Sequence, residues 1–124
     1  MKKILVVDDD TIFLKTMRDM LEPMGFTVIE AKDGVEGLAM VEKEKPNLIL
    51  LDVVMPKLDG MGFLKALQKE EKGKQIPVLI TSNFSGTNKI EEGMQYGIRG
   101  YIIKSNESLK TIINNIELII GKAD

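Results

Sequence analysis

The sequence predicts an α/β fold in which five parallel strands are covered by helices on both faces. Short apolar runs rich in Val, Ile and Leu alternate five times with segments whose apolar residues recur every three or four positions. The connections are short, so each helix packs back on the sheet as part of a right-handed crossover. The run Leu48–Leu51 is apolar at every position, which is typical of a strand buried on both faces. With 124 residues, the chain is expected to form one domain, residues 1–124.

In the first half of the chain, turn and capping residues separate the apolar runs. Asp9 or Asp10 is expected to cap the first helix, which begins at Thr11 and ends near Pro23. The tetrapeptide Asp33–Glu36 reads as a capping box at the start of the second helix, and Pro46 ends that helix. The strands predicted in this half are residues 4–7, 28–31 and 48–51.

In the second half, the third helix starts at Asp59-Gly60 and loses its apolar pattern after residue 68. The fourth helix is expected at about 87–96, where Gly93 weakens it by about 1 kcal/mol relative to Ala. Ser105 or Asn106 is expected to cap the last helix, which ends at Gly121. The strands predicted here are residues 78–80 and 101–103.

The composition excludes several classes of function. Without cysteine or histidine, the chain has no disulfide, no thiol or Ser-His-Asp catalysis and no Cys or His metal ligand, so a metal would need oxygen ligands. A net charge of −2 gives no reason to expect direct nucleic-acid binding. No apolar run approaches the roughly 20 residues of a membrane helix. These features, and a start too short in apolar residues for a signal peptide, favour a cytoplasmic protein.

Polar residues follow four of the five predicted strands. In an open parallel sheet these strand ends share one edge, where ligands bind. Each residue has an ordinary explanation as a helix cap, a turn former or a solvated side chain. Four independent strand ends that carry a matching set are harder to explain in that way. The set is Asp8 and Asp9 after the first strand, Asp52 after the third, Thr81 and Ser82 after the fourth, and Lys104 after the fifth.

These groups suit phosphoryl chemistry. Neighbouring carboxylates repel one another unless a cation lies among them, and hard divalent cations prefer carboxylate oxygens. A lysine and a hydroxyl are suitable donors around a phosphoryl group. The edge is therefore predicted to hold a divalent cation and a phosphoryl group.

The motifs at these strand ends resemble those of the receiver domain of bacterial two-component response regulators, of the stand-alone chemotaxis type. The similarity runs from about Lys2 to Gly121. It implies a flavodoxin-like sheet with strand order 2-1-3-4-5, whereas the pattern by itself gives only a parallel α/β fold. The motifs that carry it are residues 6–10 (Val-Val-Asp-Asp-Asp), 50–60 (from Leu-Leu-Asp to Leu-Asp-Gly), 77–82 (Pro-Val-Leu-Ile-Thr-Ser) and 100–104 (Gly-Tyr-Ile-Ile-Lys).

The resemblance implies that Asp52 is the phosphoacceptor, which takes a phosphoryl group from a phosphohistidine of a histidine kinase or a histidine phosphotransfer protein. It also implies that Mg²⁺ is held by Asp9, Asp52 and the carbonyl of Val54, with Asp8 acting largely through water. The chain would then be a signalling domain that catalyses only its own phosphorylation and dephosphorylation, and not a general enzyme.

Lys104 and Ser82 are expected to bind the phosphoryl group, and Ser82 with Tyr101 is expected to form the switch. Alternation along the strand places Thr81 on the opposite face from Ser82, and counting from Pro77 assigns the switch hydroxyl to Ser82. The output would be a protein target on the surface made by the fourth helix, the fifth strand and the last helix. We hypothesise that Gly93, Gly97 and Gly100 keep this region loosely held.

The oligomeric state implied is a monomer or a phosphorylation-dependent dimer.

Three departures from the family pattern are visible. Asn83 replaces a small residue, and Ser105 replaces a proline, where a cis peptide would cost about 3 kcal/mol relative to trans. Val54 and Phe84 are apolar where the family often has polar residues. We expect these two side chains to hinder water and prolong the aspartyl phosphate, so a Val54→Asn variant should lose its phosphoryl group faster.

Two alternatives remain at this stage. Residues 8–11 (Asp-Asp-Asp-Thr) approach the Asp-x-Asp-x-Thr motif of haloacid dehalogenase phosphatases, but the Thr is one position early, and no acidic pair follows Lys104. The second alternative is a receiver-like binding module that works without phosphorylation, and the intact acidic set argues against it.

Overall fold

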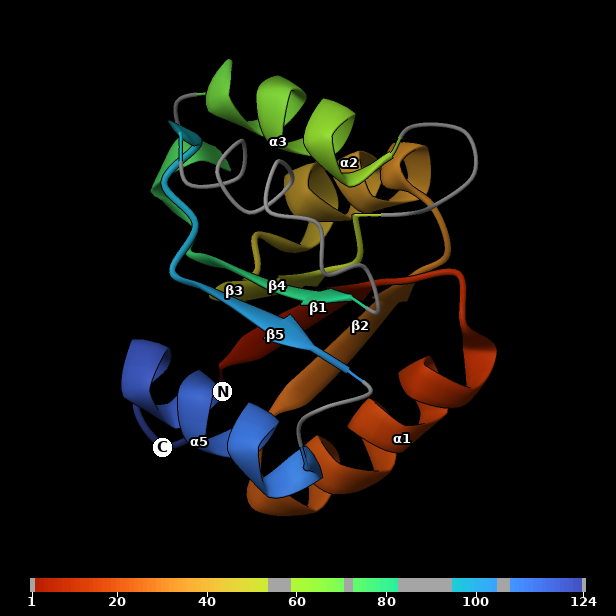
Figure 1. Ribbon diagram of the computed structural model, residues 1–124, viewed down its shortest axis with the longest axis vertical. Coiled ribbons are helices and arrows are strands. Elements are labelled where there is room, and N and C mark those ends of the chain that lie inside the picture. The colour runs from red at the N-terminus through yellow and green to blue at the C-terminus, as the bar shows by residue number, and fades with distance from the viewer. Residues whose placement is uncertain (1, 54–58, 71–72, 83–94, 105–107, 124) are drawn as a thin grey trace.

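The structure, a computed structural model, describes residues 2–53, 59–70, 73–82, 95–104 and 108–123 (Figure 1). Its five strands form one parallel sheet in the order β2-β1-β3-β4-β5, as the resemblance implied. The strands are β1 (Lys3–Val7), β2 (Thr27–Ala31), β3 (Leu48–Leu51), β4 (Val78–Ser82) and β5 (Gly100–Ile103). The α-helices are α1 (Thr11–Leu21), α2 (Gly34–Glu44), α3 (Gly60–Gln68) and α5 (Leu109–Ile120), and short 3₁₀ turns cover Glu22–Met24 and Gly73–Gln75.

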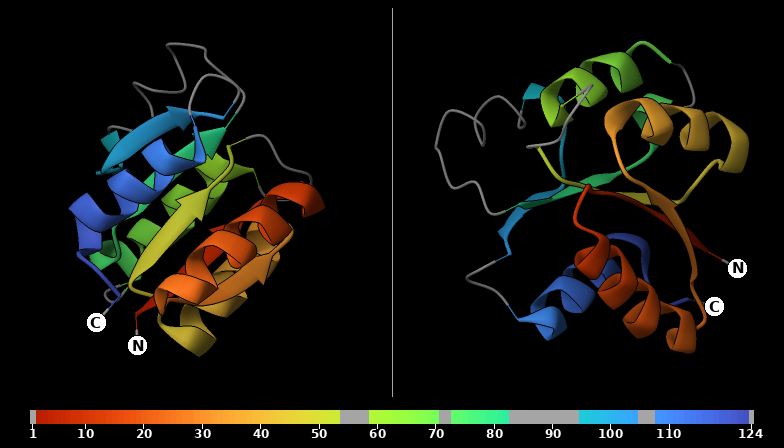
Figure 2. Two further views of the ribbon diagram at one scale, coloured as in Figure 1. Left: turned by 90° about the horizontal axis from the view of Figure 1, so that it is seen from below. Right: turned by 90° about the vertical axis from the view of Figure 1, so that its right-hand side faces the viewer.

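The helices lie in two layers on opposite sides of the sheet (Figure 2). Helices α1 and α5 cover one side, which we call the α1/α5 face, and α2 and α3 cover the other, the α2/α3 face. Within the described residues, no helix has both the length and the apolar character needed to cross a membrane.

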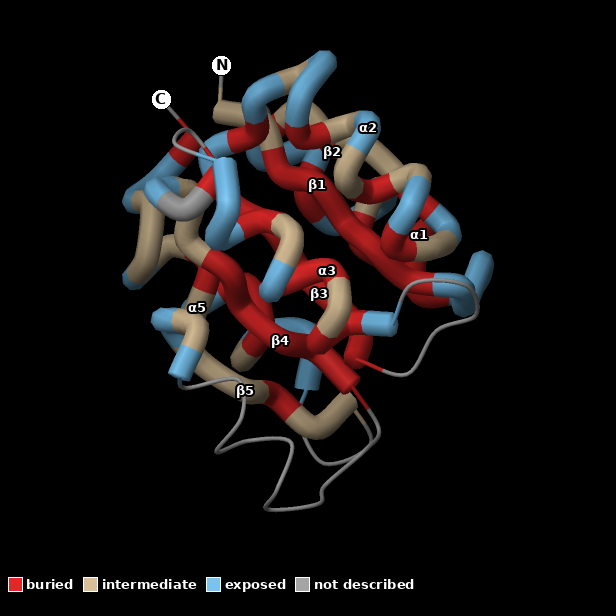
Figure 3. Tube along the Cα trace, turned by 90° about the horizontal axis from the view of Figure 1, so that it is seen from above, coloured by how far each residue is buried: buried red, intermediate tan, exposed pale blue. Residues whose placement is uncertain are grey.

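The central strands are buried on both faces, as Figure 3 shows for β1, β3 and β4. Because successive side chains of a strand point to opposite sides, each strand contributes to both halves of the core. In β4, for example, Leu79 packs on the α1/α5 face and Ile80 on the α2/α3 face. The unbroken apolar run of β3 is explained in the same way, since none of its four residues faces water.

Four strands extend further than the apolar runs predicted, by one residue in β1, β2 and β5 and by two in β4, and β4 and β2 show why. β4 continues through Thr81 and Ser82, because these residues pair with Ile102 and Ile103 of β5. β2 begins at Thr27, which is paired with Lys3 of β1. In both cases polar residues are kept in the strand by pairing with a neighbour, which the hydrophobic pattern does not record.

Side-chain caps define the starts of the described helices. The carboxylate of Asp10, one of the two caps expected for α1, accepts hydrogen bonds from the amides of Ile12 (3.0 Å) and Phe13 (3.3 Å). Asp33 accepts from the amide of Glu36 (2.8 Å), as the capping box predicted. Asp59 accepts from the amide of Gly62 (2.8 Å).

The predicted cap of the last helix was wrong. α5 begins at Leu109, and the hydroxyl of Ser108 accepts from the amide of Thr111 (3.2 Å), so neither Ser105 nor Asn106 is the cap. The reason is that several neighbouring polar residues can all serve as caps. The buried positions, which start at Ile112, decide which of them lies one turn before the core.

Several predictions concern residues outside the described ranges. These are most of the helix expected at 87–96, the residues Val54, Asn83, Phe84 and Gly93, and the peptide between Lys104 and Ser105.

Candidate functional site

Three carboxylates meet at the carboxyl edge of the sheet. Val7 and Leu51 are paired across β1 and β3, so the residues that follow them, Asp8 and Asp52, leave adjacent strands side by side. The amide of Asp52 donates to the carbonyl of Val7 (2.9 Å), which keeps the two strand ends together. One oxygen from each of Asp8, Asp9 and Asp52 lies within 4.8 Å of the others, as the order of the sheet predicted.

The three carboxyl groups differ in exposure. Asp8 is fully buried and Asp52 is 7 % exposed, whereas Asp9 is exposed. The pKa of Asp8 is raised to about 6, chiefly by burial and in small part by the charge of Asp52, while Lys104 and the amide of Asp10 oppose the rise. A dehydrated carboxylate next to others favours a compensating positive charge.

Lys104 supplies one positive charge. It follows β5, and its amide donates to the carbonyl of Ser82 (2.8 Å), which ties the end of β5 to the end of β4. Its ammonium donates to Oδ2 of Asp8 and lies 3.8 Å from Oδ2 of Asp52. The ammonium also lies 4.1 Å from the centre of the Phe13 ring, which is a cation–π distance.

The carboxylate cluster fits a hard divalent cation. Mg²⁺ binds oxygens at about 2.1 Å, so two ligands on opposite sides of the ion are about 4.2 Å apart. A set of three oxygens within 4.8 Å of one another is close to this spacing, and the exposure of Asp9 leaves one side open to water. Among the described residues, the side-chain donors at this edge that would hold the ion are Asp8, Asp9 and Asp52.

Ser82 and Tyr101, the predicted switch pair, are already in contact. Ser82 is 1 % exposed, and Tyr101 is half-buried against the core of the α2/α3 face. Burial raises the pKa of the Tyr101 phenol, the negative charge of Asp52 raises it further, and a side-chain hydrogen bond with Ser82 lowers it. The phenol therefore interacts with both the hydroxyl and the charge of the site.

Gly60, which the sequence pattern marks only as a helix start, also shapes this region. Its amide donates to the carbonyl of Val53 (3.1 Å). A Cβ on Gly60 would lie 2.4 Å from Cα of Val53 and 2.8 Å from the carbonyl oxygen of Asp52. Only glycine permits this close approach behind Asp52. The dipeptide Asp59-Gly60 predicted the start of α3, but it gave no indication that Gly60 lies so close to the backbone of Asp52 and Val53.

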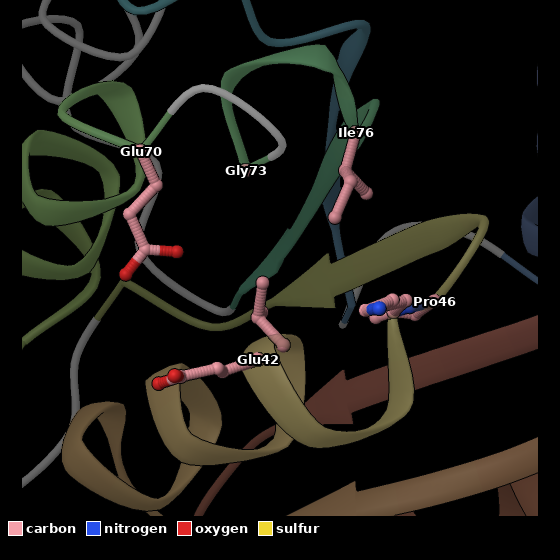
Figure 4. Close-up of a pocket in the computed structure, with 7 residues that line it drawn as sticks. Glu42, Pro46, Glu70, Gly73 and Ile76 are labelled. Atoms are coloured by element: carbon pink, nitrogen blue, oxygen red, sulfur yellow. The ribbon is translucent and has the colours of Figure 1, made fainter.

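A separate cavity of about 500 Å³ lies away from this edge, where α2 ends and β4 begins (Figure 4). Its lining includes Glu42, Pro46, Glu70 and Ile76, and none of the residues at the carboxyl edge. Because this cavity does not include the carboxylate cluster, the functional site is assigned to that cluster and not to the cavity.

A parallel sheet with acidic residues, a hydroxyl and a lysine at its carboxyl edge defines an α/β domain whose edge suits phosphoryl chemistry. Comparison with known families makes this specific: the chain belongs to the response regulator receiver domain family, which it matches over residues 4–117. It is therefore a receiver domain of the kind found in two-component signalling. Both the fold and the strand order confirm the resemblance.

The relatives that match this chain fall into two groups, those of similar length and those about twice as long. Protein PilH of Pseudomonas aeruginosa is 36% identical and is matched over 98% of this chain and 99% of its own length. The probable transcriptional regulator ycf27 of Porphyridium aerugineum is 35% identical over 98% of this chain, but over only 50% of its own length. The chain thus spans about half the length of several curated relatives that it matches.

Solved structures agree with this placement. The chemotaxis protein CheY4 of Vibrio cholerae superposes with a TM-score of 0.88 and 29% identity, over 96% of this chain and 98% of that one. The phosphatase alternative is wrong, because the family match and the fold both place the chain among receiver domains.

Proposed function

We propose that Asp52 is the phosphoacceptor of a Mg²⁺-dependent phosphorelay and that its phosphorylation changes the surface around β5 and α5. The observation that carries this proposal is the convergence of Asp8, Asp9 and Asp52 beside the ammonium of Lys104. Asp52 is suited to the role because it belongs to the cluster yet is 7 % exposed, so a donor can reach it.

In the proposed reaction, a phosphoryl group is transferred from a histidine nitrogen of the partner to a carboxylate oxygen of Asp52. An Oδ atom of Asp52 attacks the phosphorus of a phosphohistidine on a partner kinase or phosphotransfer protein. The new P–O bond forms as the P–N bond breaks, and the histidine leaves with the electrons of that bond. Reaction with water later returns Asp52 to the free carboxylate and releases phosphate. Such transfers depend on charge neutralisation and alignment more than on acid–base catalysis.

The remaining residues have supporting roles. Asp8, Asp9, Asp52 and the carbonyl of Val54 would hold Mg²⁺, which would supply positive charge near the phosphoryl oxygens. Lys104 leaves Asp8 and pairs with a phosphoryl oxygen, a short move because its ammonium is already 3.8 Å from Asp52. Ser82 donates its hydroxyl to another phosphoryl oxygen, which draws it away from Tyr101.

The move of the Ser82 hydroxyl away from Tyr101 would carry the signal to the surface of the protein. Tyr101 loses its hydrogen bond with Ser82 and turns inward, and the surface of β5 and α5 then binds a downstream protein. We propose that the domain acts in the cytoplasm, as a monomer or as a dimer that forms on phosphorylation, and does not bind nucleic acid or membranes directly. Relatives include a protein named as a sensor histidine kinase, CheAY of Helicobacter pylori, which is consistent with a kinase partner.

The test is the mass of the intact protein after incubation with Mg²⁺ and acetyl phosphate. We expect the wild type to gain the mass of one phosphoryl group, and EDTA to prevent the gain. Asp52→Asn should show no gain. Asp19→Asn is a matched control, because it removes one exposed carboxylate of α1 that pairs only with Lys15 among the described residues.

Two outcomes would contradict the proposal. A full gain in Asp52→Asn would move the phosphoacceptor to another residue. No gain in the wild type would favour a receiver-like module that works without phosphorylation.

A further inference from the structure

Thr81 carries a buried hydroxyl that the function proposed above does not use. The residue lies near the end of β4 and is 0 % exposed. Its Oγ1 atom has no hydrogen-bond partner among the residues that the structure describes. A buried hydroxyl without a partner is unfavourable, and valine, which has the same shape, would avoid that cost.

The strand pattern fixes the face on which Thr81 lies. Leu79 packs in the core of the α1/α5 face and Ile80 in that of the α2/α3 face. Because side chains alternate along a strand, Thr81 lies on the α1/α5 face and Ser82 on the α2/α3 face. The contact between Ser82 and Tyr101 agrees, since Tyr101 also packs on the α2/α3 face.

Thr81 is also next to the proposed phosphoacceptor in the sheet. Leu51 of β3 is paired with Ile80 of β4, so the following residues, Asp52 and Thr81, leave this pair as neighbours on adjacent strands. Parallel strands are about 4.8 Å apart, which places both residues at the same edge. The two hydroxyls therefore flank Asp52 from opposite sides of the sheet.

Lys104 approaches the site from the side of Thr81. Its ammonium lies over the ring of Phe13, and Phe13 belongs to the core of the α1/α5 face. The lysine follows β5, the strand that pairs with Thr81 through Ile102. Thr81 and the ammonium thus share one face of the sheet at one edge, whereas Ser82 lies on the other face.

We propose that Thr81 is a positioning residue for Lys104: its hydroxyl accepts a hydrogen bond from the ammonium when Lys104 turns from Asp8 toward a phosphoryl group on Asp52. This inference rests on the proposed function. An ammonium has three N–H donors and no acceptor. In the resting protein Asp8 takes one of them, and Asp8 gives up that bond when it holds a cation. Thr81 replaces the lost partner, so its hydroxyl is satisfied only in the phosphorylated state.

The test uses Thr81→Val, which removes the hydroxyl at constant shape, and Thr81→Ser, which keeps it. The ligand is beryllofluoride with Mg²⁺, because it forms a tetrahedral adduct on a carboxylate that resembles a phosphoryl group. We expect Thr81→Val to bind beryllofluoride roughly fivefold more weakly than the wild type, the effect of one lost hydrogen bond. Thr81→Ser should recover most of the affinity. Without ligand, Thr81→Val should melt at the same temperature or higher, because no resting hydrogen bond is lost.

A Lys104→Met background separates positioning from packing. If Thr81 acts through the ammonium, adding Thr81→Val to Lys104→Met should leave the remaining affinity unchanged. Equal binding by Thr81→Val and the wild type would overturn the inference, as would a fivefold loss that persists without Lys104. A wild type that binds no beryllofluoride and gains no phosphoryl mass would instead contradict the proposed function itself.

Discussion

At the scale of single residues, the site combines buried and exposed carboxylates with different tasks. Asp8 is fully buried, and its hydrogen bonds to Lys104 and to the amide of Asp10 (2.9 Å) hold its orientation. Asp9 is exposed, makes one side of the cluster and faces water. A cation that enters from solvent would therefore meet Asp9 before the buried Asp8.

The cluster predicts that Mg²⁺ stabilises the folded protein. A ligand that binds only the folded state at about tenfold its dissociation constant adds about 1.4 kcal/mol to the free energy of unfolding. Asp9→Asn should lose most of this increase, because it removes the negative charge of one of the three carboxylates. The measurement is urea unfolding with and without Mg²⁺.

Asp10→Asn is the control for that experiment. It makes the same change of charge one residue away, and asparagine caps a helix as well as aspartate, so α1 keeps its start. The variant should keep the full response to Mg²⁺. Equal responses in Asp9→Asn and the wild type would show that the cation does not bind at this cluster.

Residue types at the strand ends were sufficient to predict most of this site. Asp8, Asp52 and Lys104 follow apolar runs, and such runs mark where buried strands stop. The resting pair of Lys104 with Asp8 was not predicted, since the resemblance pointed only to a phosphoryl partner. Without a phosphoryl group, the buried carboxylate of Asp8 pairs with the nearest ammonium, that of Lys104. This pairing depends on the folded site and not on a local sequence pattern.

At the scale of elements, two successive lysines connect β1 to helices on opposite faces of the sheet. The ammonium of Lys2 donates to the carbonyls of Ile120 (2.5 Å) and Lys122 (2.6 Å) at the end of α5. The ammonium of Lys3 donates to the carbonyl of Glu44 (3.2 Å), the last residue of α2. The alternation of a strand sends neighbouring side chains to opposite sides, and the carbonyl end of a helix attracts positive charge.

Lys2→Met should therefore weaken the attachment of α5. We expect it to lower the free energy of unfolding by roughly 1 kcal/mol, the value of a typical hydrogen bond lost at a partly exposed site. Amide exchange in the last turn of α5 should quicken. The control is Lys65→Met, which changes an exposed lysine of α3. Equal stability of the two variants would mean that the contacts of Lys2 with α5 do not hold the helix.

These lysine contacts show why some of the structure could not be predicted from the sequence. Helical periodicity and capping residues are local signals, so α1, α2 and α3 were predicted close to their observed starts. Lys2 and Ile120 are 118 positions apart, and no local pattern links a strand start to a distant helix end. The start of α5 was missed for a related reason, because its core contacts choose among several possible caps.

At the scale of the whole molecule, the strand order brings the site together and also connects it to one side of the fold. A pattern of alternating strands and helices does not specify which strands are neighbours, so the order came from the resemblance. With β1 and β3 adjacent, the three carboxylates meet. With β4 next to β3, the hydroxyl of Ser82 lies between the carboxylates and Tyr101 of β5.

The glycines near β5 have separate explanations in the structure. Gly97 has a positive φ of 74°, which other residues rarely adopt. A Cβ on Gly100 would lie 2.9 Å from Cδ1 of Leu79, so this glycine lets β5 pack closely on β4. The hypothesis that glycines keep this region loosely held did not include this role of Gly100, which is to let β5 and β4 pack closely. Under the proposed function, the half-buried side chain of Tyr101 is the more direct link between the site and the surface.

This link predicts where hydrogen exchange changes when beryllofluoride and Mg²⁺ bind. If Ser82 leaves Tyr101 for the phosphoryl-like group, amides of residues 100–104 and of α5 should change their exchange rates by severalfold. Those of β1 and β2, on the far side of β3, should change little outside the residues next to Asp8. Tyr101→Phe should respond less in α5 than the wild type, because it lacks the hydroxyl that Ser82 holds. A response confined to residues next to Asp52 would separate ligand binding from the output and leave Tyr101 without a role in the switch.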